Sequence, residues 1–120
     1  METTTSLITA ETPALHAFIQ SITERHRKHV QLVAPRVLEL FDVVHETEVG
    51  PRYIRVVRSE RAAGTDRVIS RSAHSFIERT TGNVLKAAGW KGPAKGSRGN
   101  IFSADGGLAR MGPYGPEYNR

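Results

Sequence analysis

Apolar and polar residues alternate with helical spacing early in the chain. Four large apolar residues follow one another at i, i+3, i+4 and i+7: Leu15, Phe18, Ile19 and Ile22. This spacing is typical of a helix with one apolar face. Thr12 suits the N-cap and Pro13 the first helical turn, whereas Pro35 would clash with a continuing helix. The pattern predicts a helix over about residues 13–33.

A second apolar series follows Pro35. Its members fit helical spacing again: Val37, Leu40, Phe41 and Val44. The spacing favours a second helix over about residues 36–46. The alternative is a strand, because the segment RVLELFDVV is rich in residues that favour strands.

The pattern changes to a period of two beyond Gly50 and Pro51. Ile54 and Val56 would lie on one face of a strand, with Arg55 and a tyrosine on the other. A turn around Gly64 leads to a long strand over residues 68–79. The segment TTGN at residues 80–83 then forms a turn before a third strand. Short connections between neighbours predict an antiparallel meander.

These elements predict an α+β fold in which an N-terminal helix or helix pair packs on a small three-stranded antiparallel sheet. We expect one domain, with its core in residues 1–88, helices at about 13–46 and the sheet at about 52–88. Nine of the eleven glycines lie from residue 82 onward, which disfavours a regular helix or a central strand there. Residues 89–120 are therefore expected to form a Gly/Pro-rich basic extension.

Composition narrows the functional classes. The absence of cysteine excludes disulfides, thiolate metal sites and a cysteine nucleophile. The N-terminus lacks the features of a secretion signal, and no apolar run approaches the roughly 20 residues of a membrane helix. The net charge of +5 is uneven, because residues 1–50 carry −3 and residues 51–120 carry +8. We therefore expect a protein that is neither secreted nor bound to a membrane, with its cationic chemistry in the second half.

The stretch WKGPAKGSRGN concentrates glycines and cations around Trp90. Glycine lets backbone N–H groups converge on an anion, and Lys91, Lys95 and Arg98 would attract phosphate. Trp90 could stack on a base or anchor the loop. The alternative is a core tryptophan with solvated lysines around it. The order Lys-Gly-Ser, without a following helix, excludes a nucleotide-hydrolysing P-loop.

Further cations fall on the predicted hairpins: Arg52, Arg55, Arg58, Arg61, Arg67, Arg71, Arg79 and Lys86. A basic sheet face with Arg55 and Arg71 near Tyr53 would suit RNA or single-stranded nucleic acid. The alternative is that these arginines lie on a solvent-exposed sheet face and only increase the solubility of the protein. The candidate nucleic-acid-binding residues are Arg55, Arg71, Lys86, Trp90, Lys91, Lys95 and Arg98.

Metal and catalytic sites have weaker support. His26 and His29 share a helical face, but spacing fixes no third ligand, and His45 is only a further candidate. Strand alternation would point His74 away from Ser75, and no acid is placed to orient the imidazole. We expect no metal and no cofactor, and the sequence favours a non-enzymatic protein.

Residues 72–102 contain a phenylalanine-bearing strand, a T-T-G turn, V-L-K-A, W-K-x-P-A-K and R-G-N-I-F. This pattern, which covers about a quarter of the chain, resembles small uncharacterised proteins encoded by bacteriophages and environmental viral genomes. The resemblance implies a viral origin and a location in the host cytoplasm or the virion. It supplies no catalytic residues.

The leading hypothesis is a non-enzymatic viral accessory protein that contacts RNA or DNA through the basic sheet face and the Gly/Lys/Arg loop. The alternative is a virion or host-directed protein-interaction module whose C-terminal extension wraps a partner subunit. Catalysis ranks third. The expected partners are nucleic acid or a host or virion protein, with self-association left open and no membrane contact.

Overall fold

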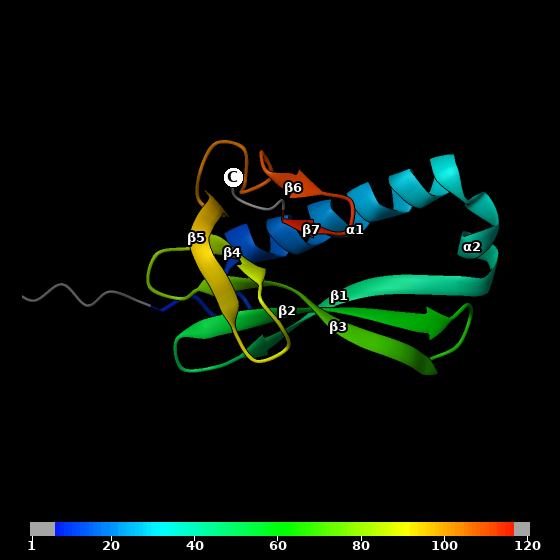
Figure 1. The fold of residues 1–120 in the computed structure, drawn as a ribbon, viewed down its shortest axis with the longest axis horizontal. Helices are drawn as coiled ribbons and strands as arrows, with labels where there is room; N and C mark the ends of the chain where they lie inside the picture. The colour runs from blue at the N-terminus through cyan, green and yellow to red at the C-terminus, as the bar shows by residue number, and fades with distance from the viewer. Residues whose placement is uncertain (1–6, 117–120) are drawn as a thin grey trace, which may run out of the picture.

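A long helix lies along one face of an antiparallel sheet in the computed structural model, which describes residues 7–116 (Figure 1). The elements of this part of the chain are α1 Pro13–Val33, α2 Pro35–Leu40, β1 Phe41–Val49, β2 Tyr53–Ala62, β3 Val68–Glu78, β4 Asn83–Ala87, β5 Pro93–Asn100, β6 Met111–Gly112 and β7 Gly115–Pro116. The first five strands form the main sheet in chain order, and β6 and β7 pair separately. The β6–β7 hairpin lies on the same side of the main sheet as α1 (Figure 1). No helix within residues 7–116 covers the other side.

Helix α1 confirms the predicted bounds of 13–33. It turns one apolar stripe toward the sheet, and its buried residues are Leu15, Phe18, Ile22, His26 and Val30. Thr12 does not cap the helix with its side chain, because its hydroxyl oxygen instead accepts a hydrogen bond from the N–H of Thr9 at 2.9 Å. Pro13 supplies the fixed φ at the helix start. In the described part of the chain, no helix is both long and apolar enough to cross a membrane.

The predicted second helix over residues 36–46 is wrong in its second half. Helix α2 ends at Leu40, and the chain then enters β1, whose nine residues pair continuously with β2 from Phe41 opposite Ala62 to Val49 opposite Ile54. Helical spacing and strand alternation share several residues here, so periodicity alone could not separate them. The cross-strand pairing of β-branched residues decided in favour of the strand.

The prediction of a three-stranded sheet is also wrong, because the sheet has five strands. One additional strand is β1, and the other is β5, which lies in the segment expected to be a Gly/Pro-rich extension. β5 is an edge strand, and Pro93 is its first residue, where a missing N–H is tolerated. Gly96 and Gly99 have φ of 93° and 147°, and the pairing with β4 shifts register twice. Glycine thus allows an irregular edge strand rather than preventing one.

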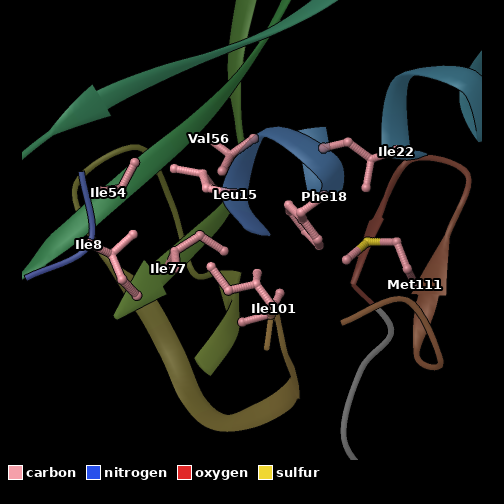
Figure 2. Packing of buried hydrophobic residues seen from close by; sticks show 10 residues of the cluster. Ile8, Leu15, Phe18, Ile22, Ile54, Val56, Ile77, Ile101 and Met111 are labelled. Carbon is pink, nitrogen blue, oxygen red and sulfur yellow. The ribbon is translucent and has the colours of Figure 1, made fainter. Parts of the chain in front are cut away.

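The main core lies between the first half of α1 and the sheet (Figure 2). The apolar residues of this cluster are Ile8, Leu15, Phe18, Ile22, Ile54, Val56, Ile77, Val84, Ile101 and Met111. Leu15 and Phe18 are at most 1% exposed. Full burial of such a side chain contributes about 1.5–3 kcal/mol relative to leaving it in water. The contribution of Met111 ties the β6–β7 hairpin to this core.

A β-bulge in β3 brings a histidine to the helix side of the sheet. Val56 pairs with Ser75 and Val57 pairs with Ala73, so His74 is an additional residue on β3. The His74 ring and the Ser75 hydroxyl are both buried and share a hydrogen bond of 2.9 Å. The prediction that His74 points away from Ser75 is therefore wrong, because a bulge interrupts the alternation of side chains.

His74 belongs to a buried histidine cluster formed with His26 of α1 and His45 of β1. The His45 ring centroid lies 4.9 Å from that of His74 and 6.4 Å from that of His26. A tyrosine, Tyr114, packs on His26 at 5.4 Å. The pKa of His45 is lowered to about 4 and that of His74 to about 3, mainly by burial and in smaller part by the neighbouring histidine and the charge of Arg58. These imidazoles are neutral at neutral pH.

We predict that acid destabilises the fold through this cluster. An unfolded histidine takes up a proton near pH 6.5, whereas His45 and His74 in the fold resist protonation until about pH 4 and about pH 3. The free energy of unfolding should therefore fall as pH drops below about 6.5, by about 1–2 kcal/mol per histidine at about pH 5. Urea denaturation at about pH 7.5 and about pH 5 measures this difference.

His74→Asn should reduce the difference between the two pH values, whatever it does to stability itself. His16→Gln is the matched control, because it removes an imidazole from the exposed surface of α1, outside the buried cluster. An equal pH dependence in His74→Asn and the wild type would contradict the prediction.

Candidate functional site

The uncovered face of the sheet carries arginines and aromatic rings. Ile54 and Val56 are fully buried in the core, so Tyr53 and Arg55 of β2 point to the opposite face, as the sequence predicted. Arg55 lies directly across from Phe76 of β3. The sheet pleat therefore places these side chains together.

Trp90 joins this face from the loop between β4 and β5. The Arg55 guanidinium carbon lies 4.4 Å from the centre of the Trp90 ring. The Arg55 Nε also donates a hydrogen bond of 2.8 Å to the Trp90 carbonyl oxygen. The Trp90 side chain is 40% exposed, so the interpretation of Trp90 as a core residue is wrong.

Rings and guanidinium groups continue in both directions from Arg55. We call the connected set the arginine–aromatic ladder, and its members are Arg52, Tyr53, Phe76, Arg55, Trp90 and Arg71. Arg52 lies 5.0 Å from the Tyr53 ring, and Arg71 lies 5.5 Å from the Trp90 ring. The Tyr53 and Phe76 rings meet edge to face at 6.2 Å. Such contacts fall within the range of cation–π and aromatic pairs and hold the side chains in defined positions.

One carboxylate binds two rungs of the ladder. Glu48 of β1 accepts a hydrogen bond of 2.6 Å from Arg55 Nη1 and one of 3.0 Å from Arg71 Nη2. The hydrogen bonds from Arg71 and Arg55, together with their charges, lower the pKa of Glu48 below its ordinary value. Glu48 is therefore ionised at neutral pH.

Two shallow hollows lie on either side of Tyr53 and Arg52. The first has a volume of about 250 Å³ and includes Arg55, Phe76 and Lys91 in its lining. The second has a volume of about 240 Å³ and includes Lys95 in its lining. The lysines of the β4–β5 segment thus extend the cationic surface of the ladder.

The ladder and its two hollows have an excess of positive charge. The cations that line them are Arg52, Arg55, Arg71, Lys91 and Lys95, and the carboxylates are Glu48 and Glu78. Glu78 lies 3.4 Å from Arg52 Nη2. The surface can therefore attract an anion while presenting ring faces beside the charges.

The structure brings together five of the seven residues predicted as a nucleic-acid site. Arg55, Arg71 and Trp90 belong to the ladder, and Lys91 and Lys95 line the adjoining hollows. These five residues come from three separate segments of the chain, so only the tertiary structure could show that they form one surface.

The other two predicted residues lie elsewhere. Lys86 pairs with Ser75 on the helix side of the sheet, and its Nζ donates a hydrogen bond of 3.1 Å to the carbonyl oxygen of Pro116. Arg98 is 4% exposed and donates from Nη1 to the carbonyl oxygens of Lys95 and Gly96 at 2.8 and 2.6 Å. Arg98 therefore shapes the β5 backbone instead of facing solvent.

The candidate residues did not include three members of the ladder or the carboxylate that bridges it: Arg52, Tyr53, Phe76 and Glu48. Tyr53 and Arg52 had a signal, because strand alternation places Tyr53 on the same face as Arg55 and because Arg52 is one of the cations of the predicted hairpins. The arrangement of Phe76 beneath Arg55 depends on the pairing of β2 with β3. Glu48 had no signal, because the strand that carries it was not predicted.

The histidines considered as metal ligands or bases do not lie in the ladder: His26, His45 and His74 form the buried cluster on the helix side of the sheet. Among residues 7–116, no three histidine, aspartate and glutamate side chains are grouped in a way that could hold a metal ion. Ser75, which shares a hydrogen bond with His74, is fully buried.

We predict that Arg55→Ala releases Trp90 from the sheet face. The change removes the stacked guanidinium and the hydrogen bond to the Trp90 carbonyl oxygen, contacts worth about 1 kcal/mol each. Because Trp90 is the only tryptophan, its emission reports on this loop alone. We expect a red-shifted emission maximum and stronger quenching by acrylamide.

Arg67→Ala is the control. This substitution removes the same charge, but Arg67 lies exposed in the β2–β3 connection. Identical Trp90 emission and quenching in Arg55→Ala and the wild type would show that the ladder contact does not hold the loop.

Comparison with known proteins gives a family but no activity. No curated protein and no solved structure matches the chain significantly. A family model described as "Family of unknown function (DUF7717)" matches residues 2–111. Because this match spans the helices, the complete main sheet and the ladder, the chain belongs to the DUF7717 family.

Proposed function

We propose that this protein binds single-stranded nucleic acid on the open face of its main sheet. The observation that carries the proposal is the arginine–aromatic ladder, in which cations and rings lie side by side on an uncovered surface. Phosphates require positive charge, and unstacked bases require an aromatic face. Both requirements are met within a few ångströms by Arg55 and Trp90.

The exposed fractions of the ladder residues indicate which of them can contact a ligand. Trp90 is 40% exposed and offers a ring surface to a base. Phe76 is 3% exposed and lies beneath Arg55, so it supports the guanidinium rather than a base. Lys91 and Lys95 are exposed and extend the charged track into the two hollows.

Single strands suit this surface better than duplexes. A duplex presents stacked bases whose faces a ring cannot reach, whereas a single strand can lay its bases on Trp90 and Tyr53. Such recognition tolerates many sequences, because every base has a face that can stack. We therefore propose weak sequence preference and a strong dependence on salt.

The setting of this activity remains a prediction. A viral origin, and a location in the host cytoplasm or the virion, are compatible with a small cationic binding protein but are not needed for the proposal. The wrapping-tail alternative has less support, because β5 pairs with β4 and the β6–β7 hairpin packs through Met111 into the core. The proposal therefore uses the sheet face and not a free tail.

The test is a titration of a fluorescein-labelled oligothymidylate with the full chain, followed by anisotropy at low and at near-physiological salt. We expect saturable binding that weakens steeply as salt rises. Trp90→Ala should weaken binding about 5- to 150-fold, which corresponds to the loss of one stacked base. A duplex of equal length should bind more weakly.

Lys91→Ala/Lys95→Ala should weaken binding and reduce its salt dependence. The matched control is Lys28→Ala/Arg36→Ala, which removes two charges from the exposed surface of α1 and α2. No saturable binding at low salt, or equal losses in the two double variants, would refute the proposal.

A further inference from the structure

Glu48 places two carboxylate oxygens between two arginines of the ladder. Oε1 accepts from Arg55 at 2.6 Å, and Oε2 accepts from Arg71 at 3.0 Å. Each oxygen thus serves one guanidinium, and the two oxygens share one central atom. A phosphodiester group presents two equivalent anionic oxygens on its phosphorus in a similar way, and guanidinium groups bind both kinds of anion.

We infer that Arg55 and Arg71 form the phosphate subsite of the ladder, and that Glu48 occupies this subsite until a nucleic-acid phosphodiester displaces it. This inference rests on the proposed function. It assigns Glu48 a specific role, because the carboxylate competes with the ligand and so sets the affinity of the surface.

The contacts around Glu48 are compatible with displacement. The side chains of Glu48, Arg55 and Arg71 are 39%, 25% and 40% exposed, so solvent and a ligand can reach the bridge. Ion pairs at such exposure contribute little to stability, because water and salt screen them. Breaking the Glu48 ion pairs therefore costs little free energy during binding.

Arg55 stays in place when Glu48 leaves. Its Nε hydrogen bond to the Trp90 carbonyl oxygen and its stacking on the Trp90 ring are independent of Glu48. Arg71 also keeps its contact with the Trp90 ring at 5.5 Å. The two guanidinium groups are thus positioned before the phosphate arrives, which reduces the entropic cost of binding.

The subsite lies next to the stacking surface. Both arginines lie within 5.5 Å of the centre of the Trp90 ring. In a single strand, a base and its own phosphate are neighbours, so the ring and the arginine pair can engage one nucleotide together. This proximity favours a nucleotide chain over an acidic protein surface, which would supply carboxylates without a ring to stack.

The test compares Glu48→Gln with the wild type in the oligothymidylate titration at low salt. The amide keeps the size of the side chain but loses the charge that competes with phosphate. We expect Glu48→Gln to bind oligothymidylate about 3- to 30-fold more tightly, because the ligand no longer has to break the two exposed ion pairs that Glu48 forms with Arg55 and Arg71. Trp90 emission should change at a correspondingly lower protein concentration.

Glu46→Gln is the matched control. Glu46 lies two residues away on β1, and its carboxylate contacts Arg61 at 3.4 Å rather than the ladder. It therefore changes the net charge by the same amount without opening the subsite. A gain in affinity that is clearly larger for Glu48→Gln than for Glu46→Gln supports the inference.

The outcomes separate the two proposals. If the wild type binds and Glu48→Gln binds no more tightly than Glu46→Gln, the subsite is wrong while the proposed function stands. If only Glu48→Gln binds, the proposed function of the wild type fails, and the inference fails too, because the phosphodiester then cannot displace Glu48. If wild type and both variants fail to bind oligothymidylate at low salt, the proposed function fails and the inference fails with it.

Discussion

The burial of the α1 apolar stripe against one face of the sheet organises this protein. Leu15 and Phe18 lie fully buried in a cluster with Ile54, Val56 and Ile77, and this burial supplies most of the driving force for folding. A single helix and one short hairpin can cover only one face of a five-stranded sheet. No helix within residues 7–116 covers the other face, where Phe76 is buried beneath Arg55 and Trp90 is 40% exposed to water.

The ladder shows how charged residues can be ordered on such a wet face. An isolated surface arginine samples many rotamers, but Arg55 is held by a ring, a carbonyl oxygen and a carboxylate at once. The groups that fix it come from β1 and from the β4–β5 loop, so its position depends on the whole sheet. Preorganised cations beside rings are better suited to binding than the same residues on mobile chains.

The covered side has a different chemistry. Where α1 passes beyond the apolar core, polar side chains join its contacts with the sheet: His26 of α1 lies against His45 and Arg58. Tyr114 of the β6–β7 connection packs on His26 and His29. The C-terminal segment is thus part of the folded unit at both ends of the hairpin, through Met111 in the core and Tyr114 on the histidines.

Local patterns in the sequence determined the features that depend on neighbouring residues. Proline positions and a 3.6-residue period fixed α1 at both ends, and alternation assigned Ile54 and Val56 to the core and Arg55 to the open face. The concentration of cations in the second half also indicated which segments would form a basic surface. Each of these features depends on local spacing or composition, which the sequence shows directly.

Only the tertiary structure decided the features that depend on partners distant in the chain. Pairing with β2 made residues 41–49 a strand, although part of this segment has helical spacing. The edge position of β5 allows a glycine-rich segment to form a strand. One additional residue in β3 reversed the direction of His74. Glu48, Arg71 and Trp90 meet only because β1, β3 and the β4–β5 loop come together in one sheet, and contacts between such distant segments have no signature in local residue spacing.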